Sequence, residues 1–115
     1  MKLGTLMAFI AVLALGQLPS TANAFGCPNS IAEAQAAIDK VMKDMKSMKM
    51  SKRDMGLVHA LLDDAKMSLA GAKHNHAKPQ GEYDHARAIG KAKASLGYAQ
   101  AADIYHWHLM GKMKK

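Results

Sequence analysis

Residues 82–110, EYDHARAIGKAKASLGYAQAADIYHWHLM, decide the fold class of this chain. Along this stretch a mostly apolar stripe recurs at alternating steps of four and three residues, which is the spacing of one helix face in a coiled-coil-like seam. The stripe consists of His85, Ile89, Ala92, Leu96, Ala99, Asp103, His106 and Met110. The pattern predicts a long helix over about residues 82–110 that packs along one side against other helices.

Two earlier stretches, residues 30–49 and 52–74, also have apolar residues at helical spacing. Ser30 can cap the first of them, with Glu33 as its capping-box partner, and Ser51 opens the second. The composition beyond these caps is rich in Ala, Met, Lys and Leu and has almost no runs of β-branched residues, which favours helices over strands. We therefore expect an all-α domain with three helices.

The connections between these helices are short, and the second contains Pro79 and Gly81, which interrupt helices. Short connections place neighbouring helices antiparallel, so the sequence predicts an up-down-up three-helix bundle. Three small helices bury little apolar surface, so dimerisation into a larger bundle is a further expectation.

Residues 1–24 have the features of a cleavable secretory signal peptide. Lys2 supplies a positive start, residues 3–18 are mostly apolar, and residues 22–24 (ANA) supply the small residues of a cleavage site. The apolar run is shorter than the roughly 20 residues of a transmembrane helix, and an uncleaved N-terminal anchor is the alternative. The sequence therefore predicts a periplasmic or secreted protein with one helical domain, residues 25–115.

The charge and the missing motifs narrow the function classes. The formal net charge is +7, and outside the cytoplasm a basic protein is expected to meet anionic membrane surfaces or acidic partners rather than nucleic acid. The sequence has no glycine-rich phosphate loop, no nucleophile elbow and no H-E-x-x-H motif, so we expect no enzymatic activity. It also lacks C-x-x-C-H and has only 5% aromatic residues, so no haem is expected.

In an up-down-up bundle the end of the first helix, the start of the second and the end of the third meet at one pole. Thioether and imidazole side chains are concentrated in these three segments, and their softness suits Cu(I) and Ag(I). The methionines of this pole include Met42, Met45 and Met55. The predicted metal ligands are His59, His106, His108, Met48, Met50, Met110 and Met113. The competing interpretation is that methionines at helical spacing fill the core.

The opposite pole carries a second, weaker candidate cluster, Cys27, His74, His76 and His85. A thiolate with imidazoles suits Zn(II), or Cu(II) if the thiol stays reduced. Residues 74–76 are expected to form a loop that turns both imidazoles to one ion. Cys27 is the only cysteine, so it is a free thiol, a metal ligand or half of an interchain bridge. Lipidation of Cys27 is a lesser alternative, because the residues before it match a lipobox poorly.

Two stretches, VHALLDDA at 58–65 and DHARAIGKAKA at 84–94, resemble the helices of periplasmic small metal-binding proteins. Those proteins are histidine-bearing helical bundles that bind several divalent metals, copper among them. The likeness covers about residues 57–106 and lies in composition, whereas this chain has fewer histidines, no regular Ala-His repeat and many more methionines. The resemblance implies a periplasmic metal-binding bundle and transfers no individual ligand.

The leading hypothesis is an exported protein that buffers or carries copper, silver or a borderline divalent ion. The alternative is a non-enzymatic helical accessory module. Such a module would dock on another envelope protein through its basic face or its methionine-rich end, because methionine-rich surfaces adapt to partners.

Overall fold

The structure is a computed structural model that describes residues 26–114, and within this range it consists of three helices and no strands. The helices are α2 (Cys27–Lys46), α3 (Lys52–Ala77) and α4 (Glu82–Met113). The predicted all-α class is therefore confirmed. The predicted signal peptide lies outside the described residues, and dimerisation stays a prediction.

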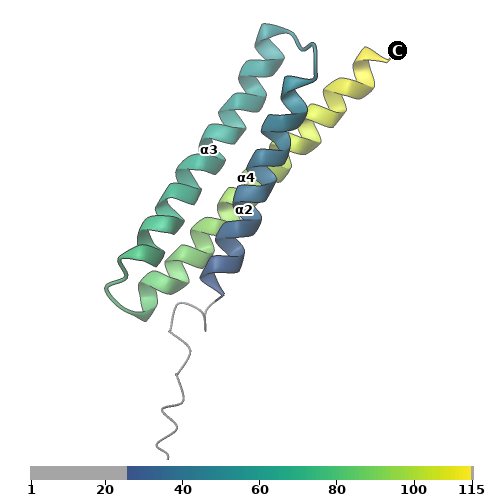
Figure 1. Ribbon diagram of the computed structural model, residues 1–115. Coiled ribbons are helices and arrows are strands. Elements are labelled where there is room, and N and C mark those ends of the chain that lie inside the picture. Colours follow the sequence, from purple (N-terminus) through teal and green to yellow (C-terminus); the bar gives the residue numbers. More distant parts are fainter. Residues whose placement is uncertain (1–25, 115) are drawn as a thin grey trace, which may run out of the picture.

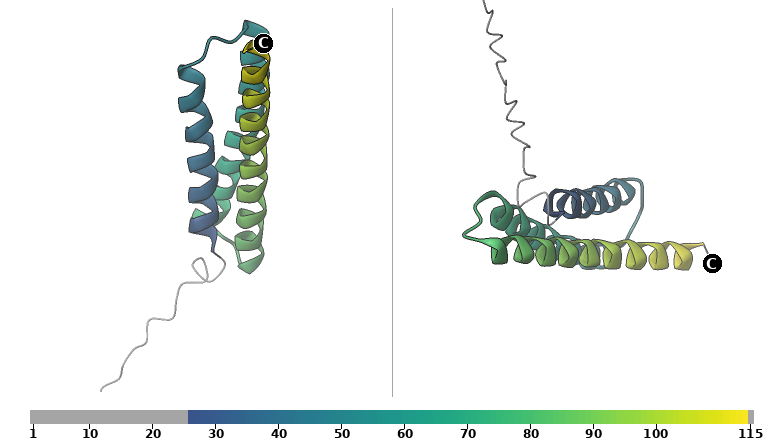
Figure 2. Two further views of the ribbon diagram at one scale, coloured as in Figure 1. Left: turned by 90° about the vertical axis from the view of Figure 1, so that its right-hand side faces the viewer. Right: turned by 90° about the horizontal axis from the view of Figure 1, so that it is seen from below.

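The three helices run up, down and up (Figure 1). One end of the bundle holds the α2–α3 connection and the end of α4, and the other holds the start of α2 and the α3–α4 turn (Figures 1 and 2). Hydrogen bonds between residues that are far apart in the sequence hold the helices in this arrangement. The Ser95 hydroxyl of α4 donates to the Ala65 carbonyl of α3 at 2.6 Å, and the Lys40 ammonium of α2 donates to Asp103 of α4 at 2.9 Å.

The first helix begins earlier and ends earlier than the sequence predicts. Gly26 takes a left-handed conformation with φ 69°, and Pro28 fits in the first turn, where its missing N–H costs no helical hydrogen bond. At the other end the Ser47 hydroxyl donates to the Asp44 carbonyl at 2.8 Å, and the Ser47 N–H bonds to the same oxygen. The helix therefore stops at Lys46.

The second helix begins where the sequence predicts, at Lys52, with Ser51 as its N-cap. The Ser51 hydroxyl accepts from the Asp54 N–H at 3.1 Å and donates to the Asp54 carboxylate at 2.8 Å. This cap satisfies one of the free N–H groups at the start of α3. The helix ends at Ala77, beyond the predicted boundary at residue 74.

Small side chains are common on the face of α4 that packs against the other two helices. The buried residues of α4 are His85, Ala88, Ala92, Ser95, Ala99, Ala102, His106 and Leu109. Half of the predicted stripe is thus buried, whereas Ile89, Leu96, Asp103 and Met110 are only partly covered. The buried stripe is thus offset toward Ala88, Ser95 and Ala102, and the Ser95 hydroxyl reaches the Ala65 carbonyl of α3 at 2.6 Å. Larger side chains, chiefly Ile38 and Val41 of α2 and Leu62 of α3, fill the space opposite.

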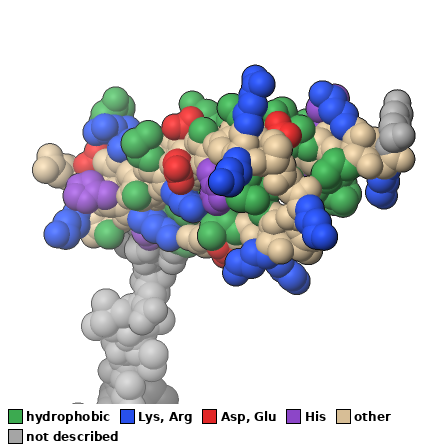
Figure 3. Space-filling view, turned by 90° about the horizontal axis from the view of Figure 1, so that it is seen from above, with side chains coloured by type: hydrophobic (Ala, Val, Ile, Leu, Met, Phe, Trp, Pro, Cys, Tyr) green, Lys and Arg blue, Asp and Glu red, His purple; other side chains and the backbone are tan. Residues whose placement is uncertain are grey.

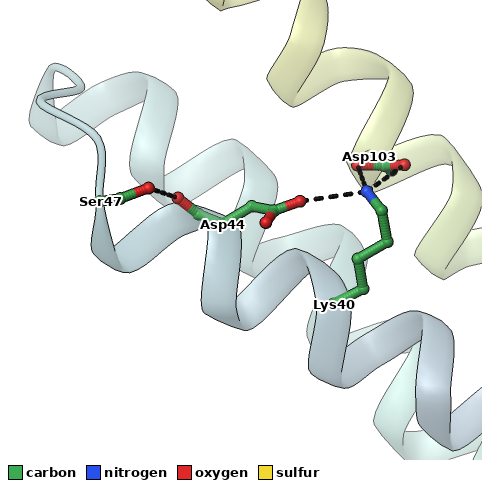
Figure 4. Close-up of polar contacts among 4 residues, drawn as sticks. All are labelled: Lys40, Asp44, Ser47 and Asp103. Carbon is green, nitrogen blue, oxygen red and sulfur yellow. Dashed lines mark hydrogen bonds and ion pairs between the residues drawn. The ribbon is translucent and has the colours of Figure 1, made fainter.

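A polar contact on the surface also joins α2 to α4. The Lys40 ammonium donates to both Asp103 oxygens, at 2.9 and 3.0 Å, and to Asp44 at 3.1 Å (Figure 4). The same ammonium lies 5.9 Å from the ring centre of Trp107. The hydrogen bonds to Asp103 and then Asp44 raise the pKa of Lys40. Because these groups are partly exposed, the contact sets the register of α2 more than it stabilises the fold.

The remaining basic charge is widely distributed. Lys and Arg side chains project from much of the outline in Figure 3 and are not confined to one patch. Within the described range, no helix combines the length and apolar character needed to cross a membrane.

Candidate metal centre

One side chain from each helix converges at the end of the bundle that holds the α3–α4 turn. These side chains are Cys27 of α2, His76 of α3 and His85 of α4, and each offers one ligand atom within 4.8 Å of the other two. The three residues are far apart in the sequence, so only the folded bundle assembles them.

Local structure explains where Cys27 and His85 lie. Cys27 is the first residue of α2, and its thiol donates a buried hydrogen bond to the His85 carbonyl at 3.3 Å. His85 follows Asp84, whose carboxylate accepts from the Gln80 N–H at 2.8 Å and from the Asn75 side-chain amide at 3.3 Å. Asp84 therefore ties the turn to both helices and sets the position of the residue that follows it.

The site is mostly closed to solvent. Cys27 has no exposed surface and His85 is 5% exposed, whereas His76 is partly exposed. The two imidazoles meet edge to face with their centres 6.2 Å apart. The buried Nδ1 atom of His76 has no hydrogen-bond partner among residues 26–114. Of the three residues, His76 is therefore the one with the most contact with solvent.

Burial raises the pKa of the Cys27 thiol, and a backbone hydrogen bond offsets part of this effect. The thiol is consequently protonated at neutral pH, and a metal ion must displace its proton. One thiolate and two imidazoles give three of the four ligands of a tetrahedral zinc site and leave one position open. The same three ligands also form trigonal copper sites.

The structure brings together three of the four residues of the predicted weaker cluster. The fourth, His74, is exposed and lines a polar hollow with Asp84, Arg87 and Lys91. The expectation that residues 74–76 form a loop is wrong, because α3 continues to Ala77. Two residues apart on a helix differ by about 200° in direction, so His74 and His76 point to opposite sides.

The predicted methionine–histidine ligands lie near the other end of the bundle, but no single hollow collects them. Met48 and His59 line a cavity between α2 and α3. His106 is 1% exposed and packs edge to face on Trp107, with ring centres 5.8 Å apart. Neither imidazole nitrogen of His106 has a hydrogen-bond partner in the described part of the chain.

The other members of that predicted set are outside the cavity lining. His108 and Met113 are exposed, and Met50 and Met110 are partly buried. Three methionines left out of the predicted ligand set, Met42, Met45 and Met55, line the cavity instead. Their positions in the sequence could have indicated this, because they lie on both sides of the α2–α3 connection, where the two helix ends face the same cavity.

Comparisons with protein-family models, with curated proteins and with solved structures found no match. The candidate centre is therefore argued from the geometry of this chain alone.

Proposed function

We propose that this protein binds a transition-metal ion through Cys27, His76 and His85 and buffers or carries it outside the cytoplasm. The observation that carries the proposal is the convergence of three ligand atoms, one from each helix, within 4.8 Å of one another. Export is supported by the composition of residues 1–24.

The ligand types favour a borderline ion. Imidazole suits zinc and copper, and thiolate selects zinc and Cu(I) over calcium or magnesium. Zn(II) is the divalent ion that this set favours, with Cu(I) as the monovalent one. An open fourth position and the partial exposure of His76 would allow the ion to be exchanged with another carrier.

Binding at this centre would also stabilise the bundle. The seam of α4 is built largely of alanine, so the core gains little from large apolar side chains. A metal ion held by three helices would join their ends and add its binding free energy to folding.

Titration of residues 25–115, the domain predicted to remain after signal-peptide cleavage (the mature domain), with Co(II), a spectroscopic substitute for Zn(II), tests the proposal. A thiolate ligand gives an intense charge-transfer absorption that imidazole ligands alone do not give. Cys27→Ser should abolish this band, and His85→Ala should weaken Zn(II) binding by more than the roughly 10–100-fold that loss of an outer-shell partner costs.

His74→Ala is the matched control, because His74 is close in sequence to His76 but lies outside the cluster. This variant should bind Zn(II) as tightly as the parent. Equal Zn(II) affinity in the Cys27→Ser, His85→Ala and parent proteins would refute the proposal.

A docking function is the second candidate, and an apolar hollow supports it. Leu57, Ala60, Leu61 and Tyr105 line a hollow of about 350 Å³ between α3 and α4. Leu57 is 45% exposed, so this apolar surface is available to an envelope protein. Leu57→Glu should abolish capture of such a partner and leave Zn(II) binding unchanged; equal capture by the variant would exclude this surface.

A further inference from the structure

A cavity of about 340 Å³ lies between the end of α2 and the start of α3, at the opposite end of the bundle from the Cys27 cluster. Its lining consists of Met42, Met45, Lys46, Met48, Met55 and His59. Four thioethers and one imidazole therefore face one space, and four of the chain's ten methionines are among them.

Core packing involves only two of these four methionines, Met45 and Met55. Met45 is 7% exposed and belongs to the hydrophobic core. Met55 is partly exposed and packs against this core. Met42 is 36% exposed and Met48 is partly exposed. Elsewhere the core is filled by aliphatic side chains such as Leu62. Met42 and Met48 neither belong to this core nor pack against it.

The chain geometry around the α2–α3 connection directs these side chains to one place. Met42 and Met45 are three residues apart and share a face of α2. After the helix ends, the Met48 N–H bonds to the Met45 carbonyl at 3.3 Å, which keeps Met48 beside the last turn. On α3, Met55 and His59 are one turn apart and share the facing side.

We propose that this cavity is a second metal site, one that takes a soft monovalent cation, Cu(I) or Ag(I). Thioether sulfur is a soft, neutral ligand that binds Cu(I) in preference to Zn(II) or Mg(II). Methionine side chains are flexible, so they can close from a cavity of this size onto a single ion. This second site extends the proposed metal-binding function. It rests on that proposal, because both require that the protein encounters metal ions.

Electrostatics restrict the charge of the ion. Lys46 lines the cavity, and its ammonium repels any cation bound there. A monovalent ion meets half the repulsion that a divalent ion meets. Removing this charge should therefore tighten the binding of a cation that lies in the cavity.

Protonation separates this site from the Cys27 centre. Thioethers do not take up protons in the accessible pH range, whereas imidazoles do so near pH 6.5. Thioether sulfur therefore remains available as a ligand at about pH 5, where protons compete with metal ions for free imidazole. Ag(I) is the suitable probe because it needs no reductant.

The experiment is a calorimetric Ag(I) titration of the mature domain at about pH 5, in a Cys27→Ser background that removes the thiol. This protein should bind one Ag(I). Adding Met48→Leu and Met55→Leu, which nearly conserve volume, should weaken binding at least about tenfold. Met67→Leu is the control, because Met67 lies on α3 outside the cavity and is 70% exposed.

Ag(I) binding that is equally tight in the double variant and in the Met67 control would overturn the second site. Lys46→Gln should tighten Ag(I) binding several-fold at low ionic strength; unchanged or weaker binding would place the ion outside this cavity. Co(II) binding by the parent at neutral pH is measured separately, so failure of the Cys27 centre and failure of this cavity give different results.

Discussion

The two ends of the bundle differ in how they assemble donor atoms. At one end Cys27, His76 and His85 project from three helices and are largely fixed by burial and by the turn around Asp84. At the other end, flexible methionines from α2, α3 and their connection surround an open cavity. A single small fold can therefore present one fixed, buried set of donor atoms and one flexible set that consists mainly of thioether sulfurs.

The largest expected difference between the ends is in pH dependence. Burial raises the pKa of the Cys27 thiol above its usual value of 9.0, so Zn(II) must displace the thiol proton throughout the range from pH 8 to pH 6. Zn(II) affinity should fall roughly tenfold for each pH unit and each displaced proton. Ag(I) binding by the Cys27→Ser protein should change little over the same range. Parallel pH profiles in isothermal titrations would contradict this comparison.

The next largest effect is metal-dependent stability. At a free Zn(II) concentration 100 times the dissociation constant, linkage predicts about 2.7 kcal/mol of added stability. For a domain of this size that corresponds to a rise in Tm of roughly 10 °C or more. Differential scanning calorimetry with and without Zn(II) measures it. Cys27→Ser should lose the rise and His74→Ala should keep it; an equal rise in both variants would place the ion elsewhere.

A smaller and local effect should follow from loss of the α3 cap. Ser51→Ala removes the acceptor for the Asp54 N–H, at a cost of about 1 kcal/mol. Because Ser51 lies at the methionine end, hydrogen exchange should accelerate in the first turns of α3 and not around residues 76–85. Uniform acceleration at both ends would show that the two ends do not open independently.

The smallest effect concerns the surface contact between α2 and α4. Lys40→Ala removes the contacts to Asp103 and Asp44 and should lower Tm only slightly, less so in high salt. Since the pKa of Lys40 is raised, its contribution is present below pH 10.5 and is lost as the pH rises through the folded-state pKa. Thermal melts at two salt concentrations check this. A large loss of stability that salt does not change would contradict the surface assignment.

Periodicity and caps predicted much of the fold. The spacing in residues 82–110 identified α4, and Ser51 marked the start of α3. The inner face of α4 was only half predicted, because the stripe was chosen for large apolar residues. The buried face of α4 instead includes the small residues Ala88, Ser95 and Ala102.

The candidate site was harder to predict because it depends on helix ends. Because the second helix was predicted to end at residue 74, residues 74–76 were expected to form a loop. The helix continues for three more residues, to Ala77, so His74 and His76 point in different directions. Similarly, Met42 and Met45 were assigned to the right pole but not chosen as ligands. Which donor faces a cavity is decided by where α2 stops, at Lys46, and by the turn that follows.

X-ray absorption spectroscopy of the Zn(II)-loaded mature domain at neutral pH tests the Cys27 centre most directly. We predict one sulfur scatterer at about 2.3 Å, together with two imidazole nitrogens at about 2.0–2.1 Å. A zinc coordination shell of nitrogen and oxygen alone, without sulfur, would contradict the account.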